Sequence, residues 1–186
     1  MRATVELLGE RGFEVTMDDV ARRAGMARAT LYEHFGNRLG LFRALARETA
    51  RRADLAQLDA VLDHPDPLVG LRALVRQACR FWAVDPDAWR GIHALAAFGG
   101  EFGAWWTDAS APTLDRVQLM VARLDAGGCL REHWTTERAF AALVTITSFE
   151  TYDQLHFRCG VDPATAEGIL ADLAATLVTL SRAATA

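Results

Sequence analysis

The stretch from Thr16 to Arg38, which reads TMDDVARRAGMARATLYEHFGNR, constrains the fold more than any other part of the chain. Thr16 is a residue type that caps helix N-termini, and Asp19 stands where a capping box needs an acidic partner. Small apolar residues follow at helical spacing as far as Gly25, where a left-handed backbone can end a helix. These signals predict a short helix over about residues 17–24.

A second short helix is predicted after the turn at residues 25–27. It covers about Arg28 to Phe35, and Leu31 and Phe35 fall on one face because they are four residues apart. The other face carries polar and aromatic side chains. A packed helix, a glycine turn and a second helix with a polar outer face are typical of a helix-turn-helix, whose second helix enters the DNA major groove.

The residues from Ala21 to Arg38 resemble the signature of the tetracycline-repressor-like (TetR-like) transcriptional regulators. That signature reads A-x-x-A-G-[VM]-x-x-x-T-L-Y-x-x-F-x-[NS]-[KR], and each of its fixed positions is matched here. Leu7 to Phe13 are similar to the end of the family's first helix, so the resemblance covers roughly residues 3–47. It implies an all-α fold, with a three-helix helix-turn-helix domain at residues 1–47 and a helical effector-binding and dimerisation domain at residues 48–186.

The chain departs from the family pattern in three places. The first helix, predicted over about Ala3–Arg11, begins close to Met1, whereas a basic arm precedes it in the family. Either the natural start lies upstream of Met1 or this protein makes fewer arm contacts to DNA. Ala27 replaces the usual Ser and gives up an N-cap hydrogen bond worth about 1 kcal/mol. Ala29 replaces the frequent Gly, so an operator sequence cannot be copied from a relative.

The predicted recognition helix offers groups that suit DNA. Arg28 can form two hydrogen bonds with a guanine edge, and the Ala29 methyl can meet a thymine methyl. Arg38 opens the next helix, where free N–H groups favour an anion. For Tyr32 and His34 the alternative is packing or solvation. The predicted DNA-binding residues are Thr16, Arg28, Ala29, Thr30, Tyr32, His34 and Arg38.

Charge is distributed unevenly along the chain. Residues 1–52 contain ten Arg and seven Asp or Glu, whereas the remainder contains ten Arg and seventeen acidic residues. A basic N-terminal part on an acidic body is expected when only one end of a protein meets phosphate. The charge pattern therefore supports the DNA-binding interpretation.

Composition favours a soluble, helical, cytoplasmic protein. No run of alternating β-branched residues is present, and no apolar run approaches the roughly 18 residues of a membrane span. No basic segment followed by an apolar one opens the chain, so no export signal is predicted. The three cysteines are widely spaced, which favours a reducing cytoplasm over a disulfide framework.

Further helices follow the recognition helix. A long helix is predicted from about Arg38 to Leu62, through Leu55 and Leu58, and three Asp-Pro pairs predict helices that start at Pro67, Pro86 and Pro163. A glycine-rich break is predicted at residues 99–103, with helices over about 111–126, 136–158 and 163–183. The last two are very apolar. In the family such helices pair with their copies, which implies a two-fold homodimer on a pseudo-palindromic operator.

The resemblance also implies an effector pocket among the middle helices, where most aromatic residues lie. An apolar cavity with one or two polar groups suits a hydrophobic or aromatic small molecule. Core packing is favoured over pocket lining for Trp82, Phe98 and Met120. For the two i,i+4 pairs within residues 86–106 both interpretations stay open, and Tyr152 could face the effector or a dimer seam. The predicted pocket residues are Trp82, Trp89, His93, Phe102, Trp106, Met120, Phe149 and Tyr152.

Other chemistries find little support. The histidines and cysteines lack the short spacings of metal sites, and no metal or cofactor is predicted. No nucleophile-elbow, phosphate-loop or dinucleotide motif is present, so no enzyme is predicted. The predicted function is a DNA-binding transcriptional regulator, a repressor that a small hydrophobic or aromatic effector releases from its operator. The alternatives are a ligand-independent DNA-binding protein and a small-molecule-binding protein with a non-functional helix-turn-helix.

Overall fold

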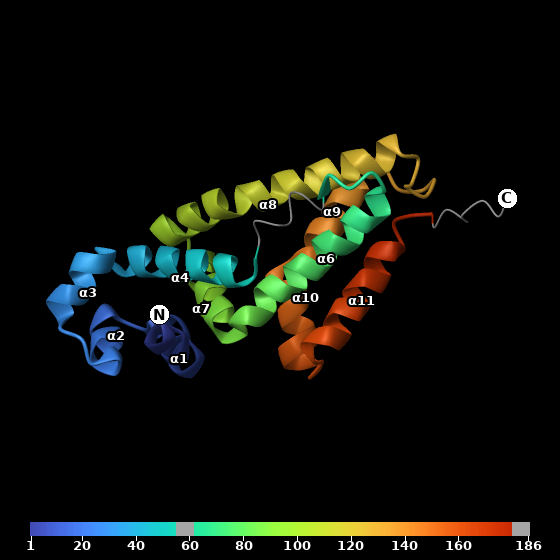
Figure 1. Ribbon diagram of the computed structural model, residues 1–186. Helices are drawn as coiled ribbons and strands as arrows, with labels where there is room; N and C mark the ends of the chain where they lie inside the picture. The colour runs from blue at the N-terminus through green and yellow to red at the C-terminus, as the bar shows by residue number, and fades with distance from the viewer. Residues whose placement is uncertain (55–61, 180–186) are drawn as a thin grey trace. The chain divides into compact units, whose positions relative to one another are not determined.

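The computed structural model describes residues 1–54 and 62–179, and these residues are helical apart from turns, loops and one isolated β-bridge (Figure 1). The predicted all-α fold is confirmed. The described residues form two compact units: residues 1–53 with 84–110, and residues 54 and 62–83 with 111–179. The domain boundary between residues 47 and 48 stays a prediction. None of the described helices is both long enough and apolar enough to cross a membrane.

The first unit contains the predicted helix-turn-helix. Its short helices match the predicted bounds to within a residue, and a 3-10 turn, η1, links the first to the second. Leu8, Val20, Leu31 and Phe42 are buried in its core, together with Trp89. The elements are α1 (Arg2–Arg11), η1 (Gly12–Glu14), α2 (Met17–Ala24), α3 (Arg28–Phe35), α4 (Arg38–Arg52), α7 (Pro86–Ala97) and the first part of α8 (Gly100–Ala126).

A capping box fixes the start of α2, as predicted. The Thr16 hydroxyl accepts a hydrogen bond from the Asp19 N–H at 3.2 Å, and the Thr16 N–H donates to the Asp19 carboxylate at 3.1 Å. At the other end, Gly25 has φ 63° and its N–H closes the last turn. Both ends of α2 are therefore set by local residues, and this fixes where α3 begins.

The turn between α3 and α4 depends on Gly40. The Asn37 side chain caps α4 by accepting from the Gly40 N–H at 2.8 Å. A Cβ atom at Gly40 would overlap the carbonyl oxygen of Phe35, the last residue of α3. Any side chain at this position must therefore displace the end of the recognition helix or the start of α4.

Helix α4 is shorter than predicted. It ends at Arg52, and Asp54 has φ 57°, a left-handed conformation that Asp tolerates better than most residues. Arg52 pairs with Asp85, the residue before α7, at 2.7 Å. The prediction of an unbroken helix from Arg38 to Leu62 was therefore wrong, because a stop at Ala53–Asp54 precedes Leu62. The predicted helical residues Leu55 and Leu58 lie outside the described residues.

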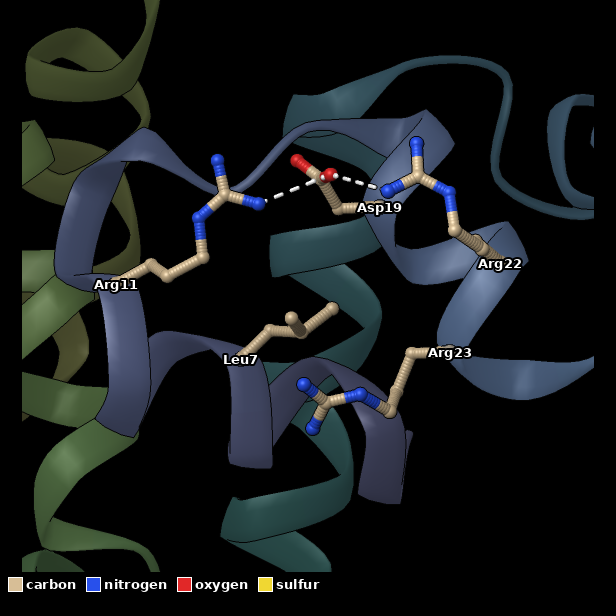
Figure 2. Close-up of a pocket in the computed structure, with 5 residues that line it drawn as sticks. All are labelled: Leu7, Arg11, Asp19, Arg22 and Arg23. Carbon is tan, nitrogen blue, oxygen red and sulfur yellow. Dashed lines mark ion pairs between the residues drawn. The ribbon is translucent and has the colours of Figure 1, made fainter.

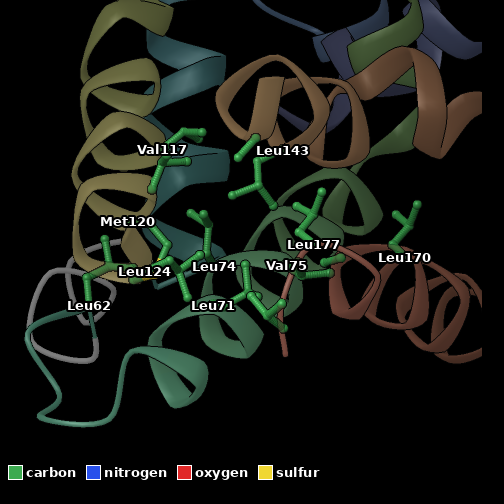
Figure 3. Packing of buried hydrophobic residues seen from close by; sticks show 14 of the residues in the cluster. Leu62, Leu71, Leu74, Val75, Val117, Met120, Leu124, Leu143, Leu170 and Leu177 are labelled. Atoms are coloured by element: carbon green, nitrogen blue, oxygen red, sulfur yellow. The ribbon is translucent and has the colours of Figure 1, made fainter. Parts of the chain in front are cut away.

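The second unit is a helical bundle around one apolar core. Figure 3 shows Leu74, Val117, Leu143 and Leu170 from four different helices in this core, and Met120 is fully buried with them. The elements are α6 (Pro67–Val84), the remainder of α8, α9 (Thr136–Thr147), α10 (Phe149–Asp153), a π-helical turn η3 (Gln154–Arg158) and α11 (Pro163–Ala175). The helix starts predicted at Pro67, Pro86 and Pro163 are confirmed.

Helix α8 begins at Gly100 rather than at residue 111, so the predicted break is confined to Gly99 and Gly100, which have positive φ. The helix continues through Pro112, which cannot donate a backbone hydrogen bond. Hydroxyl groups bond to carbonyls in the turns before the proline. Thr107 donates to the Gly103 carbonyl and Ser110 to the Thr107 carbonyl, each at 3.1 Å. The prediction missed the helical residues from Gly100 to Ser110.

The last two predicted helices are also divided or shortened. Ser148 is extended and caps α10 by accepting from the Thr151 N–H at 3.2 Å, so the predicted helix over residues 136–158 is interrupted. Helix α11 ends at Ala175 because the following residues pair with residues 129–131. The Thr179 N–H donates to the Cys129 carbonyl at 2.8 Å. The predicted continuation to residue 183, with Leu180, lies outside the described residues.

The Asp19 carboxylate gives the capping box a testable pH dependence. Hydrogen bonds from Thr16, with the Arg11 guanidinium in support, lower the pKa of Asp19 from 3.8 to about 2. A lowered pKa means that the stabilisation is complete above 3.8 and is lost as the pH falls toward about 2. We expect Asp19→Asn to lower the thermal midpoint at neutral pH, with a difference from wild type that shrinks below 3.8.

Circular dichroism melts from neutral pH down to the acid limit of folding measure this difference. Glu33→Gln, which removes an exposed carboxylate from α3, serves as the matched control. A deficit for Asp19→Asn that stays constant as the pH falls would contradict the assigned role of the carboxylate.

Candidate nucleic-acid interface

Helix α3 presents the face that the sequence predicts for base recognition. Leu31 is 3% exposed and anchors the helix in the core of the first unit. Ala29 is exposed, Tyr32 is 37% exposed and Thr30 is half-buried. An eight-residue helix with one buried leucine and an exposed outer face is accessible to a DNA groove. That these side chains contact DNA stays a prediction.

Arg28 lies at the start of α3 and is held by two neighbours. Its Nε atom is 3.0 Å from Oδ1 of Asp18 on α2, and its Cζ atom lies 5.3 Å from the centroid of the Tyr32 ring. The three side chains thus form a row of carboxylate, guanidinium and phenol ring. Asp18 was not among the predicted site residues, and it now belongs to the same cluster as two of them.

Thr16 and His34 lie at the edges of the candidate interface. The Thr16 hydroxyl is engaged in the capping box and donates to Asp19 at 2.6 Å. His34 is exposed near the C-terminal end of α3, with its ring centroid 6.2 Å from that of Phe35. Both residues remain predicted DNA contacts, although the Thr16 hydroxyl would have to exchange its present partners to bind a phosphate.

Arg38 occupies a more enclosed position than its predicted phosphate-binding role requires. Its Cζ atom lies 5.5 Å from the centroid of the Phe42 ring and 5.7 Å from that of Phe102 on α8. The two rings are themselves in edge contact at 5.6 Å. The guanidinium also donates to the Phe13 carbonyl, and burial lowers the pKa of Arg38. Arg38 therefore connects α4, α8 and η1 within the first unit.

A surface cavity of about 400 Å³ lies between α1 and α2 (Figure 2). Leu7, Arg11, Asp19, Arg22 and Arg23 line it. Arg11 and Arg22 both pair with Asp19, at 2.9 and 3.5 Å, and Arg23 pairs with Glu10 at 2.6 Å. Because acidic partners offset these arginines, the cavity is a poor anion site despite its composition.

Four of the predicted pocket residues lie in the first unit. Trp89 is buried, and its ring centroid is 5.9 Å from that of Trp106. His93 lies one turn further along α7 and contacts the same ring at 4.5 Å. Phe102 packs against Phe42 and Arg38, as described above. The core position predicted for Phe98 was wrong, because this residue follows the end of α7 and is 75% exposed, with its ring centroid 5.3 Å from that of Phe13. The structure therefore groups Trp89, His93 and Trp106, whereas Phe102 belongs to the Arg38 cluster.

The other four predicted pocket residues lie in the second unit. The indole N–H of Trp82 donates to the Thr147 carbonyl at 2.9 Å, and the Trp82 ring packs edge-on against Phe149 at 5.5 Å. Tyr152 is fully buried, and its hydroxyl has no hydrogen-bond partner among the described residues. Burial raises the pKa of Tyr152. Met120 is core and lies against Gly70, in agreement with the interpretation favoured from the sequence.

Metal chemistry is not supported by this arrangement. Among residues 1–54 and 62–179, no group of three or more His, Cys, Asp or Glu side chains could hold a metal ion. Burial raises the pKa of the Cys79 thiol to about 12, so this cysteine stays protonated and unreactive at neutral pH.

The N-terminal part of the chain matches a known family. Residues 1–45 match the model described as "Bacterial regulatory proteins, tetR family". A curated relative, the HTH-type transcriptional repressor BepR of Brucella suis biovar 1 (strain 1330), is 26% identical over 176 residues, which cover 86% of this chain and 80% of BepR.

Solved structures share the fold along nearly the whole chain. A TetR-family transcriptional regulator from Rhodococcus sp. matches with a TM-score of 0.76 at 18% identity, and covers 95% of both chains. A transcriptional regulator from Saccharomonospora viridis, in complex with choline, matches with a TM-score of 0.71 at 18% identity over 96% of this chain and 97% of that one. The matched family model and the curated repressor identify this protein as a DNA-binding transcriptional regulator that resembles the TetR family, and the solved structures show that it shares their fold.

Proposed function

We propose that this protein is a cytoplasmic repressor that binds a pseudo-palindromic operator as a homodimer and is released by a small hydrophobic or aromatic effector. The exposed face of α3, with Arg28 and Tyr32 beside the α2–α3 turn, is the observation that carries the DNA-binding part. Similarity to the repressor BepR supports repression of transcription over activation.

The apolar surface of the last helices supports the dimer. Leu173 on α11 is 45% exposed, and Phe140, Val144 and Ile146 on α9 are only partly covered within the second unit. An apolar surface of this kind is stabilised when a second copy covers it. Two recognition helices related by a two-fold axis would then meet half-sites about 34 Å apart.

Two aromatic groups support the effector site. Trp89, His93 and Trp106 form one group in the first unit, and in the second Trp82 packs against Phe149 of α10, the helix that also carries Tyr152. The buried Tyr152 hydroxyl could donate a hydrogen bond to a ligand. The relative from Saccharomonospora viridis was solved with choline, a small organic molecule, which supports ligand binding by this fold.

The contacts among Arg38, Phe42 and Phe102 support a mechanical link by which a movement of α8 reaches the recognition helix. Phe102 on α8 contacts Phe42 on α4, and only two residues separate the end of α3 from the start of α4. In this proposal the effector shifts α8 and α4 and thereby changes the spacing of the two recognition helices. Operator affinity then falls although no residue in the groove has changed.

Selection of random DNA duplexes by the purified protein tests the proposed function directly. We expect a two-fold-symmetric site. Arg28→Ala is expected to weaken binding to that site by about 1–3 kcal/mol, roughly five- to hundredfold, because a base contact is lost. Tyr32→Ala is expected to weaken it as well. Recovery of no preferred duplex by wild type would contradict the regulator proposal.

The role of Arg38 can be separated from phosphate binding by Arg38→Gln, with the exposed Arg43→Gln on the same helix as control. Loss of the contacts with Phe42 and Phe102 is expected to destabilise the protein by about 1–2 kcal/mol. The slope of log affinity against log salt should stay close to the wild-type value. A slope reduced by about 0.9 without any loss of stability would assign Arg38 to a phosphate contact instead.

The effector proposal predicts that some member of a broad panel of hydrophobic and aromatic compounds lowers operator affinity. Tyr152→Phe should weaken the response to compounds that carry a hydrogen-bond acceptor. The same variant should be at least as stable as wild type without ligand, because removing an unpaired buried hydroxyl avoids a cost of about 1–3 kcal/mol. Fluorescence anisotropy of labelled operator and thermal melts measure the two effects. Unchanged operator affinity across the whole panel would contradict release.

A further inference from the structure

The ion pair between Asp18 and Arg28 crosses the turn that joins the two helices of the helix-turn-helix. It links the second residue of α2 to the first residue of α3. Both side chains stay accessible, at 65% exposure for Arg28 and 47% for Asp18. Oδ1 of Asp18, the oxygen that faces Arg28, is covered by the protein, whereas the Arg28 guanidinium stays open to an approaching DNA surface.

The position of the carboxylate decides which edge of the guanidinium remains free. Asp18 lies against the Nε atom, at 3.0 Å, so the two terminal NH₂ groups are available. Those two groups form the fork that pairs with O6 and N7 of guanine. The Tyr32 ring, 5.3 Å from the guanidinium carbon, limits rotation of the same side chain. Holding the side chain in advance reduces the conformational entropy lost on binding.

The same carboxylate opposes a different use of Arg28. A phosphate that approached this guanidinium would bring its negative charge close to Asp18, and the two anions would repel each other. A guanine edge carries no net charge and meets no such repulsion. Asp18 therefore disfavours contacts of Arg28 with phosphate more than contacts with a base. Because phosphate contacts do not depend on sequence, this favours specific over non-specific binding.

From this geometry we infer that Asp18 is a specificity-determining residue of the DNA interface. It acts as a positioning residue, because it works through Arg28 and not by its own contact with DNA. The inference rests on the proposed function, since it assigns to Arg28 a base in the operator.

The test compares a duplex selected by wild type with a scrambled duplex of the same composition, across a range of salt concentrations. Asp18→Asn and Asp18→Ser both remove the charge, Asp18→Glu keeps it, and Glu14→Gln removes an exposed carboxylate elsewhere in the same domain. Circular dichroism melts of each variant establish that it is folded. The effect of Asp18→Asn is also measured in an Arg28→Ala background.

We expect the neutral variants to lower the ratio of specific to non-specific affinity about fivefold or more, mainly by tighter binding to the scrambled duplex. Their salt slope on that duplex should steepen by about 0.9, the value for one added phosphate contact. Asp18→Glu should retain most of the preference, and Arg28→Ala should abolish the effect of Asp18→Asn.

Two results would overturn the inference while the regulator proposal stands. One is an unchanged ratio of specific to non-specific affinity, including an equal gain on both duplexes. The other is a full effect of Asp18→Asn in the absence of Arg28. A wild-type protein that prefers no duplex would overturn the proposed function, and this inference with it.

Discussion

The guanidinium of Arg38 holds the first unit together. It lies against the Phe42 and Phe102 rings and donates to the Phe13 carbonyl, so that one cation joins α4, α8 and η1. A planar cation can stack on aromatic faces and donate in its own plane at the same time, which an ammonium group cannot do. Because α4 starts directly after the recognition helix, the placement of that helix depends on this cation as well as on the close approach at Gly40.

The helix-turn-helix could be predicted from the sequence because its signals are local. Thr16, Asp19 and Gly25 set both ends of α2 through bonds that span at most five residues. The Asp-Pro helix starts are equally local, since Asp162, for example, caps the N–H groups of the two residues after Pro163. The exposed face of α3 followed from one buried position, Leu31. These elements would form with much the same bounds in many different folds.

The remainder depends on partners that are distant in sequence. Asp54 takes a left-handed conformation near Arg52, and Arg52 pairs with Asp85, thirty-three residues further along the chain. No local sequence pattern predicts this end of α4. The pairing of Cys129 with Thr179 ends α11 early for a similar reason. Asp18 lies ten residues from Arg28, so their contact requires the turn to be built first. One signal was available: Arg38 and Phe42 are four residues apart on one helix, a spacing that favours contact.

The hydroxyl of Tyr152 is a group that folding alone does not require. Among the described residues nothing accepts or donates a hydrogen bond to it, and phenylalanine would fill the same volume without the buried polar atom. Selection for a stable fold would therefore not preserve tyrosine at this position. In a lineage that no longer needed to sense a ligand, replacement of this tyrosine by phenylalanine would not lower the stability of the fold. Whether tyrosine persists among descendants of this protein is thus a record of whether they still respond to an effector.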